Sequence, residues 1–374
     1  MPWATRGSGV RCATLPHRAT HRFLRSMTPL IVHVNTARGY RGGERQTELL
    51  VQGLKSRGLR QAVVVRRGGA LLQRVRGLSV DVREVGGGPL SVAIASGGAA
   101  LLHVHEGRSV YGAYLRSLMS GTPYVLTRRV DNPIGDHWLA HRAYAKAAAV
   151  VAVAPQIATI VRAYDPAVRV RVIESGSTGF SVDGPRVAEI RSRYPGKFIV
   201  GHVGALDNAQ KNQELVIRVA RELERSHPQL QFVLVGGGAD EAMLRNLAAG
   251  LTNVAFTGFV ENVGDHHAAF DLFILPSNRE GIGGILFDAM EQGLAVIVSA
   301  VGGLPDIVKH GDNGLLIEPG RADQLRDAIL GLVAQPQRRQ AMGARGREVA
   351  KNFTADAMCR KYLELYESVL GPLA

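Results

Sequence analysis

A strand, a glycine-rich loop and a helix within residues 271–293 constrain the fold of this chain more than any other segment. Residues 271–275 are apolar after the first and are followed by Pro276, which is typical of a buried strand and its end. Residues 285–292 carry apolar side chains on one face and precede Gly293, as expected for a helix with a C-terminal glycine. In open α/β sheets, ligands bind beyond the carboxyl ends of the strands, so this loop is predicted to be a ligand site.

The loop combines two acidic side chains with a run of glycines. Gly281, Gly283 and Gly284 allow a ligand to approach the backbone closely. The N–H groups of the first helical turn favour an anion such as a phosphate. Glu280 and Asp288 bracket this segment, and eight residues of helix would separate them by about 12 Å along the axis. That span suits a ligand with two distinct ends, such as a nucleotide-sugar.

Composition restricts the class of protein. The chain has 374 residues, enough for two domains with sizeable cores, and 46% hydrophobic and 21% charged residues indicate a globular protein. No apolar run reaches the ~20 residues of a membrane span. Cys12 and Cys359 are the only cysteines, so we expect no disulfide framework and a reducing compartment.

The formal net charge of +13 indicates a polyanionic partner, either an acidic membrane surface, a nucleic acid or a phosphorylated acceptor. Nucleic acid is disfavoured, because the basic residues are scattered and no zinc-binding spacing or aromatic RNA-binding motif is present. Residues 55–76 contain seven bases and no acid. This stretch is either a solvated basic face or a contact with anionic lipid headgroups, where each base contributes roughly 1 kcal/mol.

Residues 1–26 differ from the rest of the chain, since they hold five arginines, no acid and no apolar core of a secretory signal. Their charge is compatible with a mitochondrial transit peptide. We instead predict a disordered basic tail over residues 1–28, with Met27 as an alternative start.

The remaining pattern alternates apolar runs with helical segments. Strands are predicted at residues 30–34, 61–65, 101–105, 123–127, 149–153, 169–173, 198–204 and 231–235. Gly42 and Gly43 precede a helix over 44–54 and form either an anion-binding turn or a plain tight turn. No G-x-G-x-x-G dinucleotide fingerprint is present. Lys211 stands before a helix predicted over 212–225, and a helix over 355–370 has an apolar face.

Two pairs of histidines, one in a predicted strand and one in a predicted helical patch, suggest different roles. His103 and His105 alternate along one strand and could share a face, as structural or polar residues. We predict no metal site there, because no third ligand is near in the sequence. His266 and His267 lie in a polar helical patch and are predicted to be surface residues.

Residues 277–293, together with 302–308 and 311–316, resemble the donor-site signature of the family 4 retaining glycosyltransferases. That signature is a Glu, seven residues and a second acid, which is usually Glu and here is Asp288. The similarity extends from about residue 29 onward. It implies an α/β fold of the glycosyltransferase B type, with two doubly wound, Rossmann-like domains facing a cleft. The implied domains are an acceptor-binding domain over 29–185, a donor-binding domain over 186–350, and a segment 351–374 whose helix packs back onto the first domain.

The resemblance also implies roles for individual residues. Glu280 would hold sugar hydroxyls and stabilise developing positive charge, Asp288 would hold the ribose, and Lys211 would bind the diphosphate. Two departures from the family pattern are Ala205 in place of an Arg and Arg129 in place of a His. The candidate catalytic residues are Glu280, Arg129 and His105. The candidate donor-binding residues are Gly42, Gly43, Lys211, Gly236, Gly258, Gly281, Ile282, Gly283, Gly284 and Asp288.

The implied function is retaining transfer of a hexose-like sugar from a nucleotide diphosphate sugar to a lipid-linked or oligosaccharide acceptor. The expected setting is lipopolysaccharide or other cell-surface glycan synthesis, in the cytoplasm or peripherally on the inner face of the cytoplasmic membrane. No metal and no cofactor are expected. The alternatives are a nucleotide-sugar epimerase of the same fold and a non-catalytic donor-binding or scaffold protein with a degenerate site. The sequence specifies neither the sugar, the base, the acceptor nor the oligomeric state.

Overall fold

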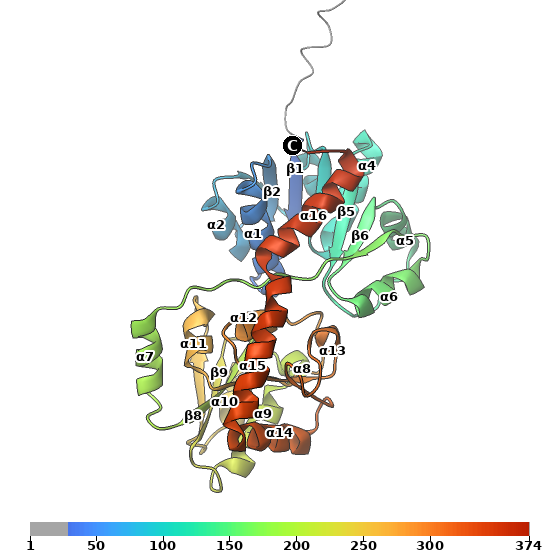
Figure 1. Cartoon of the computed structure of the whole chain (residues 1–374). Helices are drawn as coiled ribbons and strands as arrows, with labels where there is room; N and C mark the ends of the chain where they lie inside the picture. The colour runs from blue at the N-terminus through green and yellow to red at the C-terminus, as the bar shows by residue number, and fades with distance from the viewer. Residues whose placement is uncertain (1–28, 374) are drawn as a thin grey trace, which may run out of the picture.

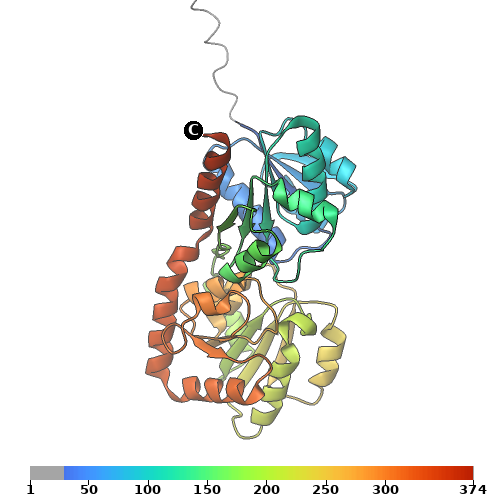
Figure 2. The same cartoon turned by 90° about the vertical axis from the view of Figure 1, so that its right-hand side faces the viewer.

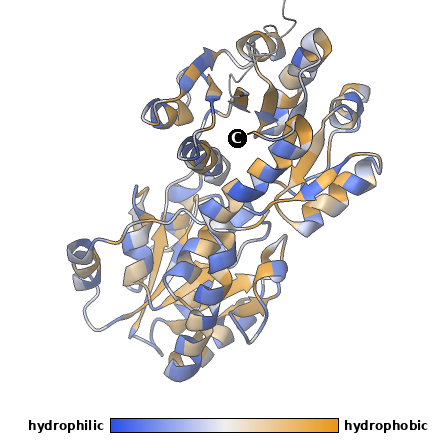
Figure 3. Ribbon diagram, turned by 45° about the horizontal axis from the view of Figure 1, so that its top comes forward, coloured by the Kyte–Doolittle hydropathy of each residue, from blue (hydrophilic) through white to orange (hydrophobic). Residues whose placement is uncertain are grey.

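The computed structural model describes residues 29–373 and contains two parallel β-sheets, each forming its own α/β domain (Figure 1). The predicted tail, residues 1–28, lies outside the described residues. The inner strands of both sheets are mainly short runs of buried aliphatic residues, as expected for parallel strands covered on both faces by helices. Figure 3 shows these strands as mostly hydrophobic ribbons between helices whose exposed faces are hydrophilic. The doubly wound α/β fold predicted from the sequence is confirmed.

The first sheet has seven strands in the order β3-β2-β1-β4-β5-β6-β7. Its strands are β1 Ile31–Asn35, β2 Gln61–Arg66, β3 Asp81–Val85, β4 Leu101–Val104, β5 Tyr124–Arg128, β6 Ala149–Ala152 and β7 Val170–Val172. Its helices are α1 Gly42–Lys55, α2 Ala70–Arg76, α3 Pro89–Ala95, η1 Gly107–Ser109, α4 Val110–Ser120, α5 Trp138–Ala145 and α6 Pro155–Tyr164. Because β1 and β4 are neighbours in register, His33 lies directly opposite His103.

The second sheet has six strands in the order β10-β9-β8-β11-β12-β13. Its strands are β8 Phe198–Val203, β9 Leu230–Val235, β10 Val254–Gly258, β11 Leu272–Leu275, β12 Val296–Ser299 and β13 Leu315–Ile317. Its helices are α7 Gly184–Ser192, α8 Asn208–Lys211, α9 Gln213–Leu223, α10 Glu241–Leu247, α11 Val263–Ala269, α12 Gly284–Glu291, α13 Leu304–Ile307, α14 Ala322–Ala334 and α15 Pro336–Ala350.

The chain end returns to the first domain through η2 Lys351–Phe353 and α16 Ala355–Leu370, which runs alongside α1 (Figures 1 and 2). Met358, Tyr362, Leu365 and Tyr366 are buried in one cluster with residues of β1, β4 and α1. The helical face predicted from their spacing is therefore the face that packs against the first sheet. Within residues 29–373, no helix is long and apolar enough to cross a membrane.

One local prediction was wrong. His266 and His267 of α11 are buried rather than on the surface, with 5% and 0% exposure. The helix predicted over residues 212–225 is α9, Gln213–Leu223, and a short helix that was not predicted, α8, precedes it. Asn212 separates the two helices with a left-handed conformation (φ 56°). Asn tolerates this conformation better than most residues. Lys211 is the last residue of α8, one residue before Asn212.

Candidate active site

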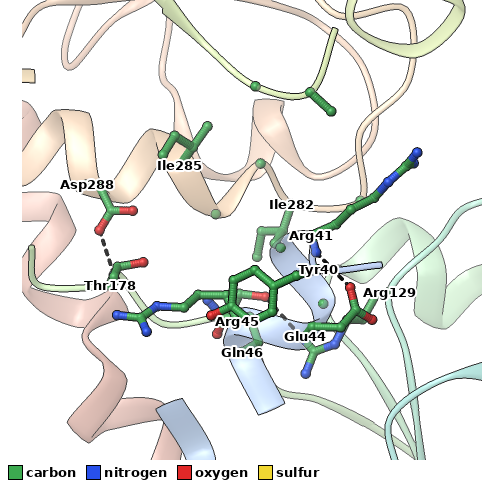
Figure 4. Close-up of a pocket in the computed structure, with 18 of the residues that line it drawn as sticks. Tyr40, Arg41, Glu44, Arg45, Gln46, Arg129, Thr178, Ile282, Ile285 and Asp288 are labelled. Carbon is green, nitrogen blue, oxygen red and sulfur yellow. Dashed lines mark hydrogen bonds between the residues drawn. The ribbon is translucent and has the colours of Figure 1, made fainter. Parts of the chain in front are cut away.

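A cleft of about 1010 Å³ lies between the two domains, at the carboxyl ends of strands in both sheets. The first domain contributes the loop before α1 and the ends of β4 and β5, and the second contributes the loops after β8, β9 and β11. Figure 4 shows side chains from both domains pointing into this space. The candidate residues that line it are Gly42, Gly43, His105, Arg129, Lys211, Gly236, Glu280, Gly281, Ile282, Gly283, Gly284 and Asp288.

Glu280 and Lys211 form an ion pair in the second domain. Lys211 Nζ donates to Glu280 Oε1, and the side chains are 14% and 5% exposed. Ser277 Oγ donates to the same carboxylate oxygen at 2.9 Å. Ion pairs with so little exposure are screened far less by salt than surface pairs. The pair therefore holds the Glu280 carboxylate in one orientation at the edge of the cleft.

The backbone around Glu280 is held by a second loop, which follows β12. A β-carbon on Gly302 would collide with the carbonyl oxygen of Glu280, and the N–H of Gly303 donates to the carbonyl of Gly281 at 2.9 Å. Gly283 is the N-cap of α12 with φ of 62°, a conformation that favours glycine. These contacts explain why glycines occur in both loops.

Asp288 lies on α12 and reaches the chain that connects the domains. The N–H of Thr178 donates to Asp288 Oδ1 at 2.5 Å (Figure 4). Burial raises the pKa of Asp288 to about 7, and this backbone hydrogen bond partly opposes the rise. The carboxyl group is thus in the cleft and is partly protonated near neutral pH.

Arg129 follows β5 and lies at a contact between the two domains. A β-carbon on Gly281 would collide with the carbonyl oxygen of Arg129. A β-carbon on Gly43 would lie 3.4 Å from the Cδ atom of Arg129. Its Nη1 donates to Ser175 Oγ at 3.3 Å, whereas Nε and Nη2 are buried and have no hydrogen-bond partner among residues 29–373. Burial lowers the pKa of Arg129 from its usual value. Its side chain lies beside Gly43 in the first turn of α1, a helix end that favours anions.

His105 belongs to a buried group of three histidines with His33 and His103. The His33 Nδ1 to His105 Nε2 distance is 3.0 Å, and the ring centroids of His103 and His105 are 3.8 Å apart. Burial lowers the pKa of all three. His103 bonds to Tyr366 of α16 at 2.6 Å and to Thr127 at 2.7 Å. The group links the cleft to the C-terminal helix.

The three histidines offer nitrogen atoms within 4.8 Å of one another. Sequence reasoning found no third ligand, because His33 is 70 and more residues away and only the parallel pairing of β1 with β4 brings it to His103 and His105. The hydrogen bonds already occupy five of the six ring nitrogens. The arrangement is therefore a hydrogen-bonded chain in the structure.

Gly236 and Gly258 of the second domain, both predicted to bind the donor, differ in their position relative to the cleft. Gly236 lines the cleft with φ of 136°, and a β-carbon there would collide with the carbonyl oxygen of Gly204. Gly258 does not line the cleft and instead accepts a hydrogen bond from the Gly236 N–H at 3.0 Å. Gly258 therefore supports the turn rather than touching the cleft.

Sequence reasoning also missed Ser277, Thr178 and Gly302, which position the acidic residues. Ser277 lies in the glycine-rich loop, three residues before Glu280, but no sequence signal shows that its hydroxyl turns back to the carboxylate. Thr178 is 110 residues from Asp288, so only the tertiary structure reveals their contact.

Solved structures define the class of fold. The Anabaena protein HepE in complex with UDP-glucose superposes with a TM-score of 0.80 over 91% of this chain and 99% of that one, at 20% identity. A sucrose-phosphate synthase from Thermosynechococcus elongatus superposes with a TM-score of 0.73 over 91% and 99%, at 20% identity. The molecule thus has the fold of the B-type glycosyltransferases.

The family model of the group 1 glycosyl transferases matches residues 185–349. The alpha-D-kanosaminyltransferase of Streptomyces kanamyceticus is 30% identical over 273 residues, which are 65% of this chain and 70% of that protein. The N-acetyl-alpha-D-glucosaminyl L-malate synthase of Bacillus anthracis is 30% identical over 176 residues, about half of either chain (46%). The chain belongs to the group 1 glycosyl transferases.

Proposed function

We propose that the protein transfers a hexose-like sugar, with retention of configuration, from a nucleoside diphosphate sugar to a lipid-linked or oligosaccharide acceptor. The observation that carries this proposal is the Glu280–Lys211 ion pair at the edge of a cleft of about 1010 Å³ between two α/β domains. A volume of this size accommodates a nucleotide-sugar. The similarity to a kanosaminyltransferase and to a protein that binds UDP-glucose supports the same class of donor.

The leaving diphosphate would be neutralised by side chains and helix N-termini. Lys211 has three donors, and one is used by Glu280, which leaves two for phosphate oxygens. The N-termini of α1 and α12 both begin with glycines at the cleft and favour anions. Arg129 adds a guanidinium group to the lining of the same cleft. These groups could stabilise the developing charge of the leaving group, so we propose that the reaction needs no metal ion.

Glu280 would act on the sugar. Lys211 and Ser277 hold one carboxylate oxygen, Oε1, and the other oxygen remains to accept from sugar hydroxyls. A carboxylate there also stabilises the positive charge that develops on the sugar ring as the donor bond breaks. Asp288, eight residues further along the chain, would hold the ribose hydroxyls of the same donor.

We further propose that the acceptor belongs to a cell-surface glycan, such as lipopolysaccharide, and that the protein works at the cytoplasmic face of the membrane. The net charge of +13 and the acid-free stretch 55–76 support contact with an anionic surface or a phosphorylated acceptor.

A donor screen followed by one substitution tests the activity. Thermal stabilisation by UDP-, GDP- and ADP-sugars identifies the donor, since a ligand that binds the folded state raises its stability. With that donor, Glu280→Gln should lower turnover at least about tenfold while the variant stays folded. Unchanged turnover would remove Glu280 from the site.

Incubation with the donor alone separates the alternatives. An epimerase would change the sugar without an acceptor. A non-catalytic protein would bind the donor and neither hydrolyse nor transfer it. A glycosyltransferase should leave the sugar's configuration intact and hydrolyse the donor slowly.

A further inference from the structure

The buried histidines of the first domain form a hydrogen-bonded chain whose direction is set by a backbone carbonyl group. Gln61, at the start of β2, donates from Nε2 to the carbonyl oxygen of Val51 at 3.1 Å. A carbonyl oxygen only accepts, so the amide nitrogen of Gln61 must face it. Oε1 of Gln61 therefore faces Nε2 of His33, 3.0 Å away.

The same reasoning fixes the proton on two imidazole rings. Burial lowers the pKa of His33 to about 4 and that of His105 well below its usual value, so each ring is neutral near pH 7 and has one proton. His33 must hold its proton on Nε2 to donate to Gln61, which leaves Nδ1 as an acceptor. Nε2 of His105 lies 3.0 Å from that Nδ1 and must donate to it. Nδ1 of His105 is then a lone-pair acceptor.

The lone pair on Nδ1 of His105 has no hydrogen-bond partner in the described chain. Two N–H donors of Arg129, which lines the same cleft, also have none. Nδ1 of His105 is buried without a hydrogen-bond partner in the described chain, as are Nε and Nη2 of Arg129. Both residues line the cleft, and the charge of Arg129 contributes to the low pKa of His105. Buried polar groups are rarely left unpaired, so a ligand or water is expected to pair with them.

The chemistry of the missing group follows from these two partners. A single group that pairs with both residues must accept hydrogen bonds from the arginine and donate one to the imidazole. A hydroxyl group does both, as does the water that it would displace, whereas a phosphate oxygen or an ionised carboxylate cannot donate. The place is also the right one for a sugar, because the backbone of Arg129 packs directly against Gly281, the residue after Glu280.

We propose that one hydroxyl group of the donor sugar donates a hydrogen bond to Nδ1 of His105 and accepts one from the guanidinium group of Arg129. The proposal rests on the proposed function, because it requires a nucleotide-sugar in the cleft. His105 and Arg129 then select for a hydroxyl at one position of the sugar, since a sugar without it leaves both residues unpaired. His33 and Gln61 do not touch the sugar and act as positioning residues that hold the tautomer of His105.

Calorimetry with two ligands tests the contact. The probe is whichever of UDP-glucose, UDP-N-acetylglucosamine, GDP-mannose and ADP-glucose raises the melting temperature most, compared with its own nucleoside diphosphate. In His105→Phe, affinity for the nucleotide-sugar should fall at least about tenfold, and affinity for the diphosphate should change less than about twofold. The matched control is His267→Phe, a buried histidine of the second domain that does not line the cleft, and it should leave both affinities unchanged.

Nitrogen NMR of the wild-type protein gives a measurement that does not depend on any variant folding. Nδ1 of His105 should resonate as an unprotonated nitrogen in the free protein, and the nucleotide-sugar, but not the diphosphate, should shift it. Gln61→Leu should populate the other tautomer of His105 and weaken nucleotide-sugar binding selectively.

The possible failures are distinguishable. If the wild type binds neither the nucleotide-sugars nor their diphosphates, the proposed function fails and this inference fails with it. If both ligands bind and His105→Phe affects them equally or not at all, the function survives and the hydroxyl contact is refuted. A protonated Nδ1 in the free protein would overturn the inference directly.

Discussion

Lys211 and Glu280 lie 69 residues apart in the sequence and form an ion pair at the edge of the cleft, with 14% and 5% of their side chains exposed. Lys211 is the last residue of α8, and Glu280 lies in the loop between β11 and α12. The cation proposed for the diphosphate and the carboxylate proposed for the sugar therefore hold each other in place before any donor binds. Substitution of Lys211 or Glu280 must therefore change the environment of the other side chain.

This ion pair predicts strong coupling between the two residues. Removing one member of a nearly buried pair leaves the other charge without a partner, which is costly. Lys211→Ala and Glu280→Gln should each destabilise the protein, and the double variant should lose less than the sum by about 0.5–3 kcal/mol. Urea denaturation of the four proteins measures the coupling. Additive losses would show that the pair contributes nothing to stability.

Lys211→Ala should also weaken nucleoside diphosphate binding by about 1.5–3 kcal/mol, the range for hydrogen bonds to charged groups. Calorimetry with the diphosphate of the preferred donor measures this loss. Arg218→Ala, an exposed cation on α9, is the control and should bind as the wild type does. Equal affinity in Lys211→Ala and the wild type would exclude Lys211 as a phosphate ligand.

The raised pKa of Asp288 predicts that donor binding is linked to protons. Its pKa of about 7 means that the carboxyl group is about half protonated at pH 7 in the free protein. Ribose hydroxyls that donate to it favour the carboxylate, so binding should release up to one proton, and affinity should rise between pH 5 and pH 7. Calorimetry in buffers of different ionisation enthalpy counts the protons.

Variants at residue 288 separate the interpretations of this site. Asp288→Asn should abolish both the proton release and the pH dependence of binding, and Asp288→Glu should crowd the pocket and weaken binding. Tighter binding by Asp288→Glu would mean that the ribose is held loosely in the wild type. Three indistinguishable affinities would show that Asp288 is not a donor ligand.

Buried histidines predict loss of stability in acid. Burial lowers the pKa of His267 to about 3 from 6.5, so its contribution is fully present above pH 6.5 and is lost as the pH falls through that range. Each such histidine changes the free energy of unfolding by about 1.4 kcal/mol per pH unit. His267→Phe should reduce the pH dependence of the free energy of unfolding by the contribution of one histidine. Denaturation between pH 6.5 and pH 4 measures this change. His310→Gln, at an exposed site, should keep the wild-type slope.

The basic stretch 55–76 predicts salt-dependent binding to anionic vesicles. Arg57, Arg74 and Arg76 already form ion pairs with acids from other segments. Arg60 and Arg67 are exposed and make no ion pair within residues 29–373. Binding to phosphatidylglycerol vesicles should weaken as salt rises from about 0.1 M to 1 M, because the Debye length falls from about 10 Å to 3 Å.

Charge-matched variants locate the vesicle contact. Arg60→Gln with Arg67→Gln should lose about 1 kcal/mol of binding for each base removed. Arg225→Gln with Arg338→Gln, two exposed bases of the second domain, should lose less. No binding, or binding that does not depend on salt, would leave the stretch as a solvated face.

The sequence alone was sufficient to predict the two-domain α/β architecture and the position of the loop that contains Glu280. Short aliphatic runs followed by glycines and amphipathic segments predict parallel strands and covering helices, because periodicity and turn preference depend on neighbouring residues. The spacing of Met358, Tyr362, Leu365 and Tyr366 predicted the buried face of α16 for the same reason. Glu280 and Asp288 could be identified as candidate site residues because both lie in one continuous strand, loop and helix.

Only the tertiary structure decided which of these residues meet. The order of strands brings His33 beside His105, 72 residues away, and the approach of the domains places Arg129 against Gly281. The same packing buries His267, which its polar sequence neighbours had suggested was exposed. Local patterns fix the direction in which a side chain leaves its own strand or helix. The partner it finds depends on strand order and domain closure, which arise from contacts between residues far apart in the chain.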